Sequence, residues 1–407
     1  MARIAFVVPT FHPTRFSGGI ACIMQYAAGL AERGHQVMVV PMLPSLEPRW
    51  CRGGYRVLAQ DPATFRWRHR RAALKAALLA AASPLSRGLR TRRGEARTAA
   101  DILALRASAG RLPYAIRRAV SLEHLREALP EADVTVATFY ETALAVALFG
   151  TGRRCYFMQH FEPYFREEST DPHLAELDAR ASYRLGLRMI ANSPWLQARV
   201  REAAPGGETH LCSNAVDLKV FNGEPKVARR ADEVVVLSFG GRGIAWKGFK
   251  EMAEAVRLVR QRLPATRVRW QVYGGAALPA DNPIAAYEDL GFLQPGLLAE
   301  AYRRADLLLS ASWYESFPLF PIEAMACGLA AITTAPGTEA YAIAGETAEV
   351  VLPRDPESVA AGLQRLIVDL DYRTALAARG HAMSQRFTWA RSVETLEGIL
   401  LAPGPVA

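Results

Sequence analysis

Short apolar runs alternate with helix-like segments along this 407-residue chain, and the alternation limits the folds available to it. A short apolar run bounded by glycine or polar residues is typical of a buried strand, and a 3.6-residue apolar period is typical of a helix. The runs expected to form strands are Ile4–Val8, Gln36–Val40, Asp133–Thr138, Arg154–Met158, Ile190–Trp195 (running into a helix start), Glu233–Phe239, Arg267–Tyr273, Leu290–Leu293, Ala305–Ser310, Ala330–Thr333 and Val350–Leu352. The expected helices are Ile20–Arg33, Glu141–Phe149, Tyr183–Met189, Phe249–Arg262, Pro295–Arg303 and Trp389–Leu400, with two more that start at Pro356 and Tyr372. Strands that alternate with helices in both halves predict an α/β protein with two Rossmann-like, doubly wound domains.

The length allows two domains of about 200 residues, each with its own core. The segment 205–230 has a linker-like composition and marks the expected boundary. We therefore assign residues 1–210 to an N-terminal domain and residues 211–390 to a C-terminal domain. Residues 391–407 form a final helix and tail that could pack back on the N-terminal domain. A central cleft between two such domains is the default ligand site.

Two glutamates lie close together in the stretch Trp313–Gly328. The pattern predicts a loop after a strand, with Glu315 at its mouth, and a helix that starts at Pro321, since proline suits a first helical turn. Glu323 would then lie in that turn, where the helix dipole favours a carboxylate. Free N–H groups at the helix start would form an anion site. The alternative is that Glu323 is only a favourable first-turn charge and Glu315 a solvated loop residue.

A loop that contains glycines follows the first strand of each half, and in the second half this loop also contains two cations. Arg242 and Lys247 lie in a glycine-rich loop and could neutralise a diphosphate, or they could be ordinary surface cations. This loop is not a Walker pattern, so it does not predict nucleotide hydrolysis of the P-loop kind. In the first half, Gly18 and Gly19 could let the backbone approach a phosphate or sugar, or could simply make a turn. They do not form a dinucleotide fingerprint.

His160 and Glu162 follow the strand predicted at Arg154–Met158. Ligands of parallel α/β sheets bind beyond the carboxyl ends of the strands, so both residues stand where chemistry is expected. Alternatively, His160 ends the strand and only forms a hydrogen bond with the backbone.

The positive charge of the chain is concentrated near its start. Residues 1–100 contain sixteen Lys and Arg but four Asp and Glu, and residues 62–94 contain nine basic residues and no acidic one. Such a segment could lie on an anionic membrane, bind an acidic partner or form a solvated helical face. No nucleic-acid motif accompanies it, so no nucleic-acid partner is expected. The apolar run Ile4–Val8 is too short for a signal peptide, and no run reaches the length of a membrane span.

Five scattered cysteines without a Cys-x-x-Cys pair indicate a reducing compartment and no zinc site. We therefore expect a cytoplasmic protein, with peripheral contact at the inner membrane surface as an option. The single Asp-x-Asp pattern, Asp369-Leu370-Asp371, falls between two late helices, so no metal or other cofactor is expected.

Because these motifs follow one another in this order, nearly the whole chain resembles the retaining glycosyltransferases of family 4, which have the GT-B architecture. The residues that carry the resemblance are Gly18-Gly19, Arg33-Gly34-His35, Asn192-Ser193, Asn214, Asp217, Phe221, Arg242, Lys247-Gly248, Glu315, Glu323 and Ala324–Gly328. The segment Tyr156–Phe165 also looks like a stretch of bacterial rhamnosyltransferases, which commonly have Asp where this chain has His160.

The resemblance implies roles for these positions. In the family, the position of Glu323 holds the donor ribose and that of Glu315 contacts the transferred sugar. Arg242 and Lys247 would hold the diphosphate. Backbone amides assist at the positions of Phe317, Pro318 and Leu319. Pro318 departs from the family, in which many members have glycine, because proline has no N–H to donate. On the N-terminal side, the loop of Gly18 and Gly19 would close over the donor, and His160 would lie beside the reacting sugar.

The implied activity is transfer of a hexose or deoxyhexose from a nucleotide-diphosphate sugar to an acceptor hydroxyl, with retention and without a metal. The acceptor would be a glycan, a lipid-linked molecule or a small molecule, as in polysaccharide or glycoside biosynthesis. A nucleotide-sugar hydrolase or epimerase with the same fold is the first alternative. A basic, non-enzymatic adaptor at a membrane surface is the second.

Overall fold

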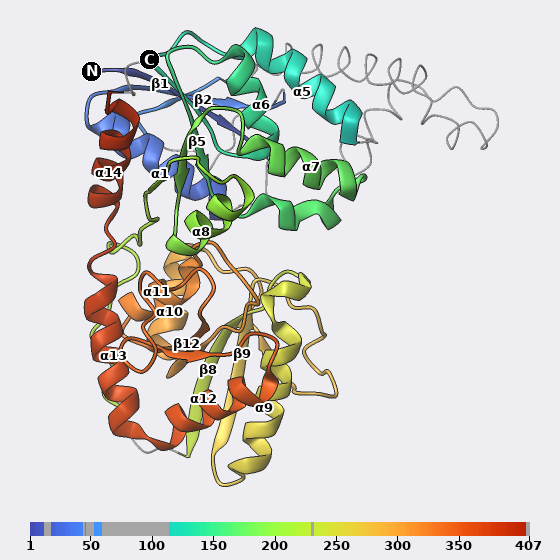
Figure 1. Cartoon of the computed structure of the whole chain (residues 1–407). Helices are drawn as coiled ribbons and strands as arrows, with labels where there is room; N and C mark the ends of the chain where they lie inside the picture. Colours follow the sequence, from blue (N-terminus) through green and yellow to red (C-terminus); the bar gives the residue numbers. More distant parts are fainter. Residues whose placement is uncertain (12–17, 44, 46–52, 59–113, 229–231, 404–407) are drawn as a thin grey trace, which may run out of the picture. The chain divides into compact units, whose positions relative to one another are not determined.

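The computed structural model describes residues 1–11, 18–43, 45, 53–58, 114–228 and 232–403. The basic segment 62–94 lies outside the described residues. The chain forms two compact units: unit 1 contains residues 1–191, 197–212 and 393–407, and unit 2 contains residues 192–196 and 213–392. Each unit is a parallel sheet with helices packed on it (Figure 1), which confirms the predicted α/β class.

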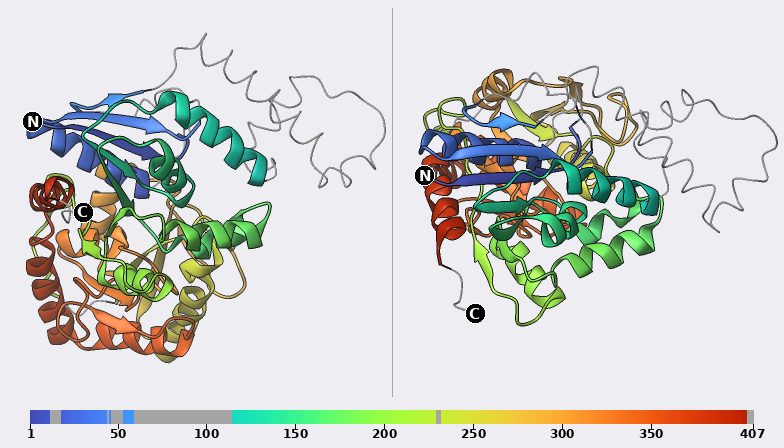
Figure 2. Two further views of the ribbon diagram at one scale, coloured as in Figure 1. Left: turned by 45° about the horizontal axis from the view of Figure 1, so that its top comes forward. Right: turned by 90° about the horizontal axis from the view of Figure 1, so that it is seen from above.

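The sheet of unit 1 has seven parallel strands in the order β3-β2-β1-β4-β5-β6-β7. Its strands are β1 (Arg3–Val8), β2 (Gln36–Pro41), β3 (Arg56–Val57), β4 (Val134–Ala137), β5 (Arg153–Met158), β6 (Arg188–Ala191) and β7 (Thr209–Leu211). Strands β1 and β2 lie side by side (Figure 2), with Arg3 opposite Gln36. All but the first residue of β1 and every residue of β4 are buried. Apolar runs without alternation are what a parallel sheet covered on both faces requires.

The helices of this half are α1 (Gly18–Glu32), α5 (Tyr114–Ala128), α6 (Tyr140–Phe149), α7 (Pro172–Ser182) and α8 (Pro194–Ala203), with a 3-10 helix η2 (Glu162–Glu168). The helix predicted at Tyr183–Met189 is wrong, because Gly186 there has a φ of 70° and β6 begins at Arg188. The helix that precedes this point is α7. Asp171 starts it by accepting the N–H of Leu174 at 3.1 Å, and Pro172 occupies its first turn.

The sheet of unit 2 has six parallel strands in the order β10-β9-β8-β11-β12-β13. They are β8 (Glu233–Phe239), β9 (Arg267–Tyr273), β10 (Glu288–Asp289), β11 (Leu307–Leu309), β12 (Ala330–Thr334) and β13 (Glu349–Val351). Its helices are η3 (Ala245–Lys247), α9 (Phe249–Arg262), α10 (Pro295–Arg304), α11 (Leu319–Ala326), α12 (Pro356–Val368) and α13 (Leu370–Ser384), and α14 (Trp389–Leu401) begins in this unit. The strand predicted at Leu290–Leu293 is wrong, since pairing with β9 occurs at Glu288 and Asp289.

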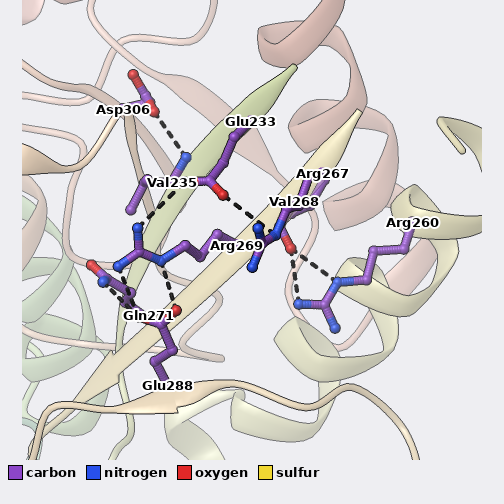
Figure 3. Close-up of polar contacts among 9 residues, drawn as sticks. All are labelled: Glu233, Val235, Arg260, Arg267, Val268, Arg269, Gln271, Glu288 and Asp306. Atoms are coloured by element: carbon purple, nitrogen blue, oxygen red, sulfur yellow. Dashed lines mark hydrogen bonds and ion pairs between the residues drawn. The ribbon is translucent and has the colours of Figure 1, made fainter. Parts of the chain in front are cut away.

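A row of polar side chains crosses β8, β9 and β10 (Figure 3). Arg267, Arg269 and Gln271 alternate along β9 and therefore share one face of the sheet. Glu233 on β8 lies 3.3 Å from both Arg267 and Arg269. Glu288 on β10 accepts hydrogen bonds from Arg269 at 2.6 Å and from Gln271 at 2.8 Å. We call these five residues the polar ladder.

The end of α14 belongs to unit 1. Glu397 forms ion pairs with Arg33 and, at 2.7 Å, with the largely buried His35. Arg188 donates to the carbonyl of Ile399 at 2.7 Å, and Arg153 donates to that of Leu400. The last helical turns therefore complete the unit that the N-terminus begins. Among the described residues, no helix is long and apolar enough to cross a membrane.

Candidate active site

In unit 2, Glu315 lies in the loop between β11 and α11 and is only 7% exposed. Its Oε1 accepts a hydrogen bond from Ser312 Oγ at 3.1 Å and forms an ion pair with Lys247 Nζ. Glu315 is therefore a buried carboxylate with one oxygen held by Ser312 and Lys247, and the alternative of a solvated loop residue is wrong. The two predicted site residues meet although they lie 68 positions apart in the chain.

Lys247 ends the short helix η3, which follows β8. Its Nζ lies 4.2 Å from the centre of the Trp246 ring, and 5.9 and 5.7 Å from the centres of the Phe239 and Phe320 rings. An ammonium group is attracted to the faces of aromatic rings. Three rings and the Glu315 carboxylate therefore hold this charge in place, and Lys247 is not an ordinary surface cation.

The loops of Lys247 and Glu315 are joined along their length. The Trp313 N–H donates to the Trp246 carbonyl at 2.8 Å, and the Trp313 indole N–H donates to Glu251 at 2.8 Å. Gly248 has a φ of 70° and packs so tightly that a Cβ there would lie 1.9 Å from the Ala311 carbonyl oxygen. The two loops are thus packed closely together around the ion pair.

Three stacked aromatic rings, which the sequence did not single out, continue this packing: Trp246, Tyr314 and Trp195. Tyr314 stacks on Trp246 with 5.2 Å between ring centres, and on Trp195 with 6.4 Å. Next to it, Ser316 donates a hydrogen bond to Asn192. Asn192 was recognised only as part of the family pattern, and its partner lies 124 positions away. No local signal could have predicted that contact.

Helix α11 begins at Leu319, two residues before the predicted start at Pro321. The first turn of a helix has no intrahelical acceptors for its N–H groups, so Pro321 is accommodated at the third position as easily as at the first. Leu319 and Phe320 supply first-turn N–H groups, whereas Pro318 at the N-cap and Pro321 have none to offer. The Pro318 carbonyl accepts the Tyr341 hydroxyl at 2.6 Å. Phe317, just before it, is buried.

Glu323 is the fifth residue of α11, so the prediction that it lies in the first turn is wrong. Its carboxyl group is enclosed, although the residue retains some exposed surface. Burial raises the pKa of Glu323 to about 8, while a hydrogen bond from Tyr302 acts in the opposite direction. Tyr302 is itself hydrogen-bonded to Tyr273 at 2.8 Å. This carboxyl is held by a tyrosine pair rather than by the helix dipole.

Arg242 lies in the loop between β8 and η3, and its side chain is exposed. Its φ of 53° is in the left-handed region, which is unusual for a residue other than glycine. Its backbone N–H donates to the Gly275 carbonyl at 2.8 Å. Strained backbone of this kind costs about 1–3 kcal/mol and is concentrated at functional sites.

In unit 1, Gly18 and Gly19 are the first residues of α1, so the prediction of a glycine loop before a helix at Ile20 is wrong. Neither has a positive φ. A Cβ at Gly19 would lie 3.4 Å from Gln159 Cβ, and one at Gly18 would meet open space. The start of α1 therefore approaches the end of β5, beside His160.

His160 is 8% exposed and follows β5. Its ring centre lies 4.6 Å from that of Phe165, and its Nδ1 lies 3.3 Å from the Phe161 carbonyl oxygen. The backbone contact named as an alternative is present, and the position at the carboxyl end of the sheet is as predicted.

Glu162 has a structural role that the sequence did not indicate. It is 2% exposed, accepts the Tyr140 N–H at the start of α6 at 2.6 Å, and accepts the Tyr156 hydroxyl. Burial raises the pKa of Glu162 to about 8, although both hydrogen bonds act against the shift. Glu162 therefore ties the loop of His160 to the helix that follows β4.

Unit 2 thus brings together Lys247, Glu315 and the start of α11, with Arg242 on the same loop as Lys247. Unit 1 places Gly18, Gly19 and His160 at the carboxyl end of its own sheet. Asp369 accepts the Tyr372 N–H at 2.9 Å at the start of α13. Within the described ranges, no group of three or more His, Cys, Asp or Glu side chains could hold a metal ion.

Comparison with known proteins agrees with this geometry. The chain is similar in fold to sucrose-phosphate synthase from Thermosynechococcus elongatus, with a TM-score of 0.69, 16% identity and 98% coverage of both chains. It is also similar to HepE of Anabaena in complex with UDP and glucose, with a TM-score of 0.65, 17% identity and coverage of 99% of this chain and 100% of that one. The two parallel-sheet units therefore have the GT-B fold, in which their structural neighbours are glycosyltransferases.

Residues 233–369 of unit 2 match the family described as Glycosyl transferases group 1. It is 33% identical over 204 residues to the D-inositol 3-phosphate glycosyltransferase of Stackebrandtia nassauensis. That match covers 45% of this chain and 46% of the relative, so the chain spans less than half of the relative's length.

Proposed function

We propose that this protein transfers a sugar from a nucleotide-diphosphate sugar to an acceptor hydroxyl, with retention of anomeric configuration and without a metal ion. The observation that carries the proposal is the Lys247–Glu315 ion pair, held by aromatic rings beside the start of α11. The structure of HepE with UDP and glucose, a protein of the same fold, supports a nucleotide sugar as the donor.

The arrangement suits a departing diphosphate. Negative charge develops on the leaving group in the transition state, so cations and N–H groups already in place lower the barrier. Lys247, Arg242 and the first-turn N–H groups of α11 would supply them. Because Pro318 and Pro321 donate nothing, only Leu319 and Phe320 offer first-turn amides, and the two cations must carry most of the stabilisation.

The carboxyl groups would hold the two ends of the donor. Glu315 is fixed by Ser312 and Lys247, so it is placed to accept hydroxyl groups of the transferred sugar. Glu323 would bind the ribose hydroxyls from the next turn of α11. His160 of unit 1 would lie beside the reacting sugar. The acceptor hydroxyl would attack that sugar on the same face from which the leaving group departs.

The test is nucleotide release from a panel of UDP-, GDP- and dTDP-sugars by the purified full-length protein, with and without EDTA. We expect release with one donor class, unchanged by the chelator. NMR of the first product formed should show the anomeric configuration of the donor. Activity abolished by EDTA, or an inverted product, would refute the corresponding part of the proposal.

The hydrolase or epimerase alternative is separated by the same assay. A transferase should release nucleotide much faster when acceptor is added, whereas a hydrolase should release it equally well without acceptor. An epimerase should release none and should instead convert the donor into its epimer, which NMR of the donor detects. Contact of the basic segment 62–94 with anionic membranes remains a prediction, which salt-sensitive sedimentation with anionic liposomes would test.

A further inference from the structure

A small cavity of about 40 Å³ lies in unit 1 and is lined mainly by residues of α5, α6 and α7. Figure 1 shows where these three helices lie. Its walls combine rings, charges and short aliphatic side chains: Tyr114, Arg118, Tyr140, Glu141, Leu144, Asp178, Ala181, Ser182 and Leu185. A cavity needs about 10–15 Å³ of such volume for each water molecule, so this one has room for about three oxygen atoms. None of these residues belongs to the site described above.

The charged groups of the cavity are held in pairs. Arg118 Nε lies 3.1 Å from Asp178 Oδ2, and the Tyr114 hydroxyl donates to the same oxygen at 2.8 Å. On the other side, Arg117 forms an ion pair with Oε1 of Glu141. Since each carboxylate has an arginine, the cavity is close to neutral in charge, and its lining is more apolar than polar. Both features suit an uncharged ligand that offers hydroxyl groups and a carbon skeleton better than an anion or a cation.

The strongest indication that the cavity binds a ligand comes from Glu141. Its side chain is 1% exposed, and its second oxygen, Oε2, is buried without a hydrogen-bond partner among the described residues. A buried polar atom left without a partner is costly, so such atoms usually face water or a ligand. Burial also raises the pKa of Glu141, against the charge of Arg117 and against hydrogen bonds from Tyr140 and Arg117.

The cavity is connected to the loop of His160. Tyr140, which lines it, donates its N–H to Glu162 Oε2 at 2.6 Å, and Glu162 lies two residues beyond His160. The helix α6 that bears Tyr140 and Glu141 follows β4, next to β5 in the sheet. Cavity and histidine therefore share the carboxyl end of the same sheet, where ligands of parallel sheets bind.

We propose that this cavity is a subsite for the acceptor, and that it takes the hydroxyl-bearing edge of a sugar unit. Glu141 Oε2 and Asp178 accept hydroxyl hydrogens, Arg118 donates to a hydroxyl oxygen, and the rings of Tyr114 and Tyr140 cover the ring edge. Two or three hydroxyl groups replace the waters that the cavity can hold. This inference rests on the proposed transfer function and deepens it by naming the acceptor as a carbohydrate.

The experiment measures binding directly, so it does not depend on turnover. Saturation-transfer NMR is recorded for the methyl glycosides of glucose, mannose, galactose and rhamnose with the full-length protein. Variant Leu144→Phe fills the cavity without touching an ion pair, and Glu141→Gln keeps the shape but replaces the carboxylate. Leu148→Phe is the matched control, because Leu148 lies one turn further along α6 and is 60% exposed.

We expect at least one glycoside to bind the wild-type protein and the control. Its affinity should fall roughly tenfold or more in both cavity variants. In Leu144→Phe the added ring occupies the space of the sugar hydroxyls, and in Glu141→Gln the charge-assisted hydrogen bond to the carboxylate is lost. Equal affinity in all four proteins, or no saturation of the wild type by any glycoside, would overturn the subsite. Binding of UDP-, GDP- and dTDP-sugars is measured by titration calorimetry on the same samples. Failure of every protein to bind any of these donors counts against the transfer function, whereas donor binding beside failed glycoside binding counts against the subsite alone.

Discussion

Lys247 and Glu315 form an ion pair whose two side chains are 13% and 9% exposed. Each charge compensates the other in the absence of substrate, so neither side chain is a buried charge without a partner before the donor binds. A donor diphosphate would then add a second anionic partner to a lysine that is already fixed in position. This saves the conformational entropy that a flexible lysine loses on binding.

Removing one partner of this pair should affect both stability and donor binding. Lys247→Met leaves the Glu315 carboxylate with Ser312 alone, and we expect a loss of about 3 kcal/mol of unfolding free energy, the low end for a broken buried pair. The nucleotide-sugar affinity should fall roughly 100-fold. Urea unfolding and titration calorimetry measure the two effects. Lys250→Met, at an exposed lysine of α9, is the control and should change neither.

The close contact between the two active-site loops should make Gly248 irreplaceable. Gly248→Ala would add a left-handed alanine, at about 1–2 kcal/mol, and a Cβ placed 1.9 Å from the Ala311 carbonyl oxygen. Gly243 has a similar φ of 78°, but a Cβ there meets nothing within 4 Å. In thermal unfolding, Gly243→Ala should therefore lower stability only by the free energy of placing an alanine in the left-handed region. Equal destabilisation by the two substitutions would mean that the loops are not packed as described.

The raised pKa of Glu323 predicts how stability changes with pH. Its value of about 8 lies above the ordinary 4.5, so the folded state binds a proton that the unfolded state releases. Unfolding free energy should therefore fall as the pH rises from about 5 to about 8, with Glu162 adding to the effect. Glu323→Gln should remove on the order of a few kcal/mol of this decline.

Urea unfolding at half-unit intervals from pH 5 to pH 9 tests the Glu323 prediction. Glu346→Gln, at an exposed position, should reproduce the wild-type profile. A Glu323→Gln profile parallel to that of the wild type would show that Glu323 is ionised throughout. The same variant should bind nucleotide sugar more weakly if this carboxyl group holds the ribose.

The end of α14 should stabilise unit 1 through Glu397. Hydrogen bonds from His35 and then Arg33 lower the pKa of Glu397, so its contribution is present above pH 4.5 and is lost as the pH falls through the lowered value. Glu397→Gln should cost about 1–2 kcal/mol at pH 7 and little in strong acid. Glu394→Gln, at an exposed position of the same helix, is the control for the chemical denaturation series.

Local sequence patterns predicted the sheets well where strands are short, apolar and bounded by glycine. β8 and β9 were predicted with their observed ends, because runs such as Glu233–Phe239 have no competing helical period. The start of α11 was misplaced because proline fits any position of the first turn equally well. Helix α7 was missed although Asp171 and Pro172 form an ordinary start signal.

The candidate site residues could be named one by one from the sequence, but their contacts could not be predicted from it. The ion pair of Lys247 and Glu315 joins two different strand ends, and only the order of strands in the sheet brings those ends together. The same is true of Ser316 and Asn192. The pKa of Glu323 is raised by burial and lowered less strongly by a hydrogen bond from Tyr302, and no sequence period encodes this contact between α10 and α11.

The polar ladder has a consequence for solubility. β10 ends its sheet with a strand of two residues, both acidic, and Arg269 holds one of them, Glu288. An open strand edge can recruit a strand from another molecule, and natural proteins discourage this with very short edges and charged side chains. Weakening the ladder, for example by Arg269→Val, would favour self-association of partly opened molecules. Its loss should appear as turbidity during expression or heating before any change in catalysis is seen.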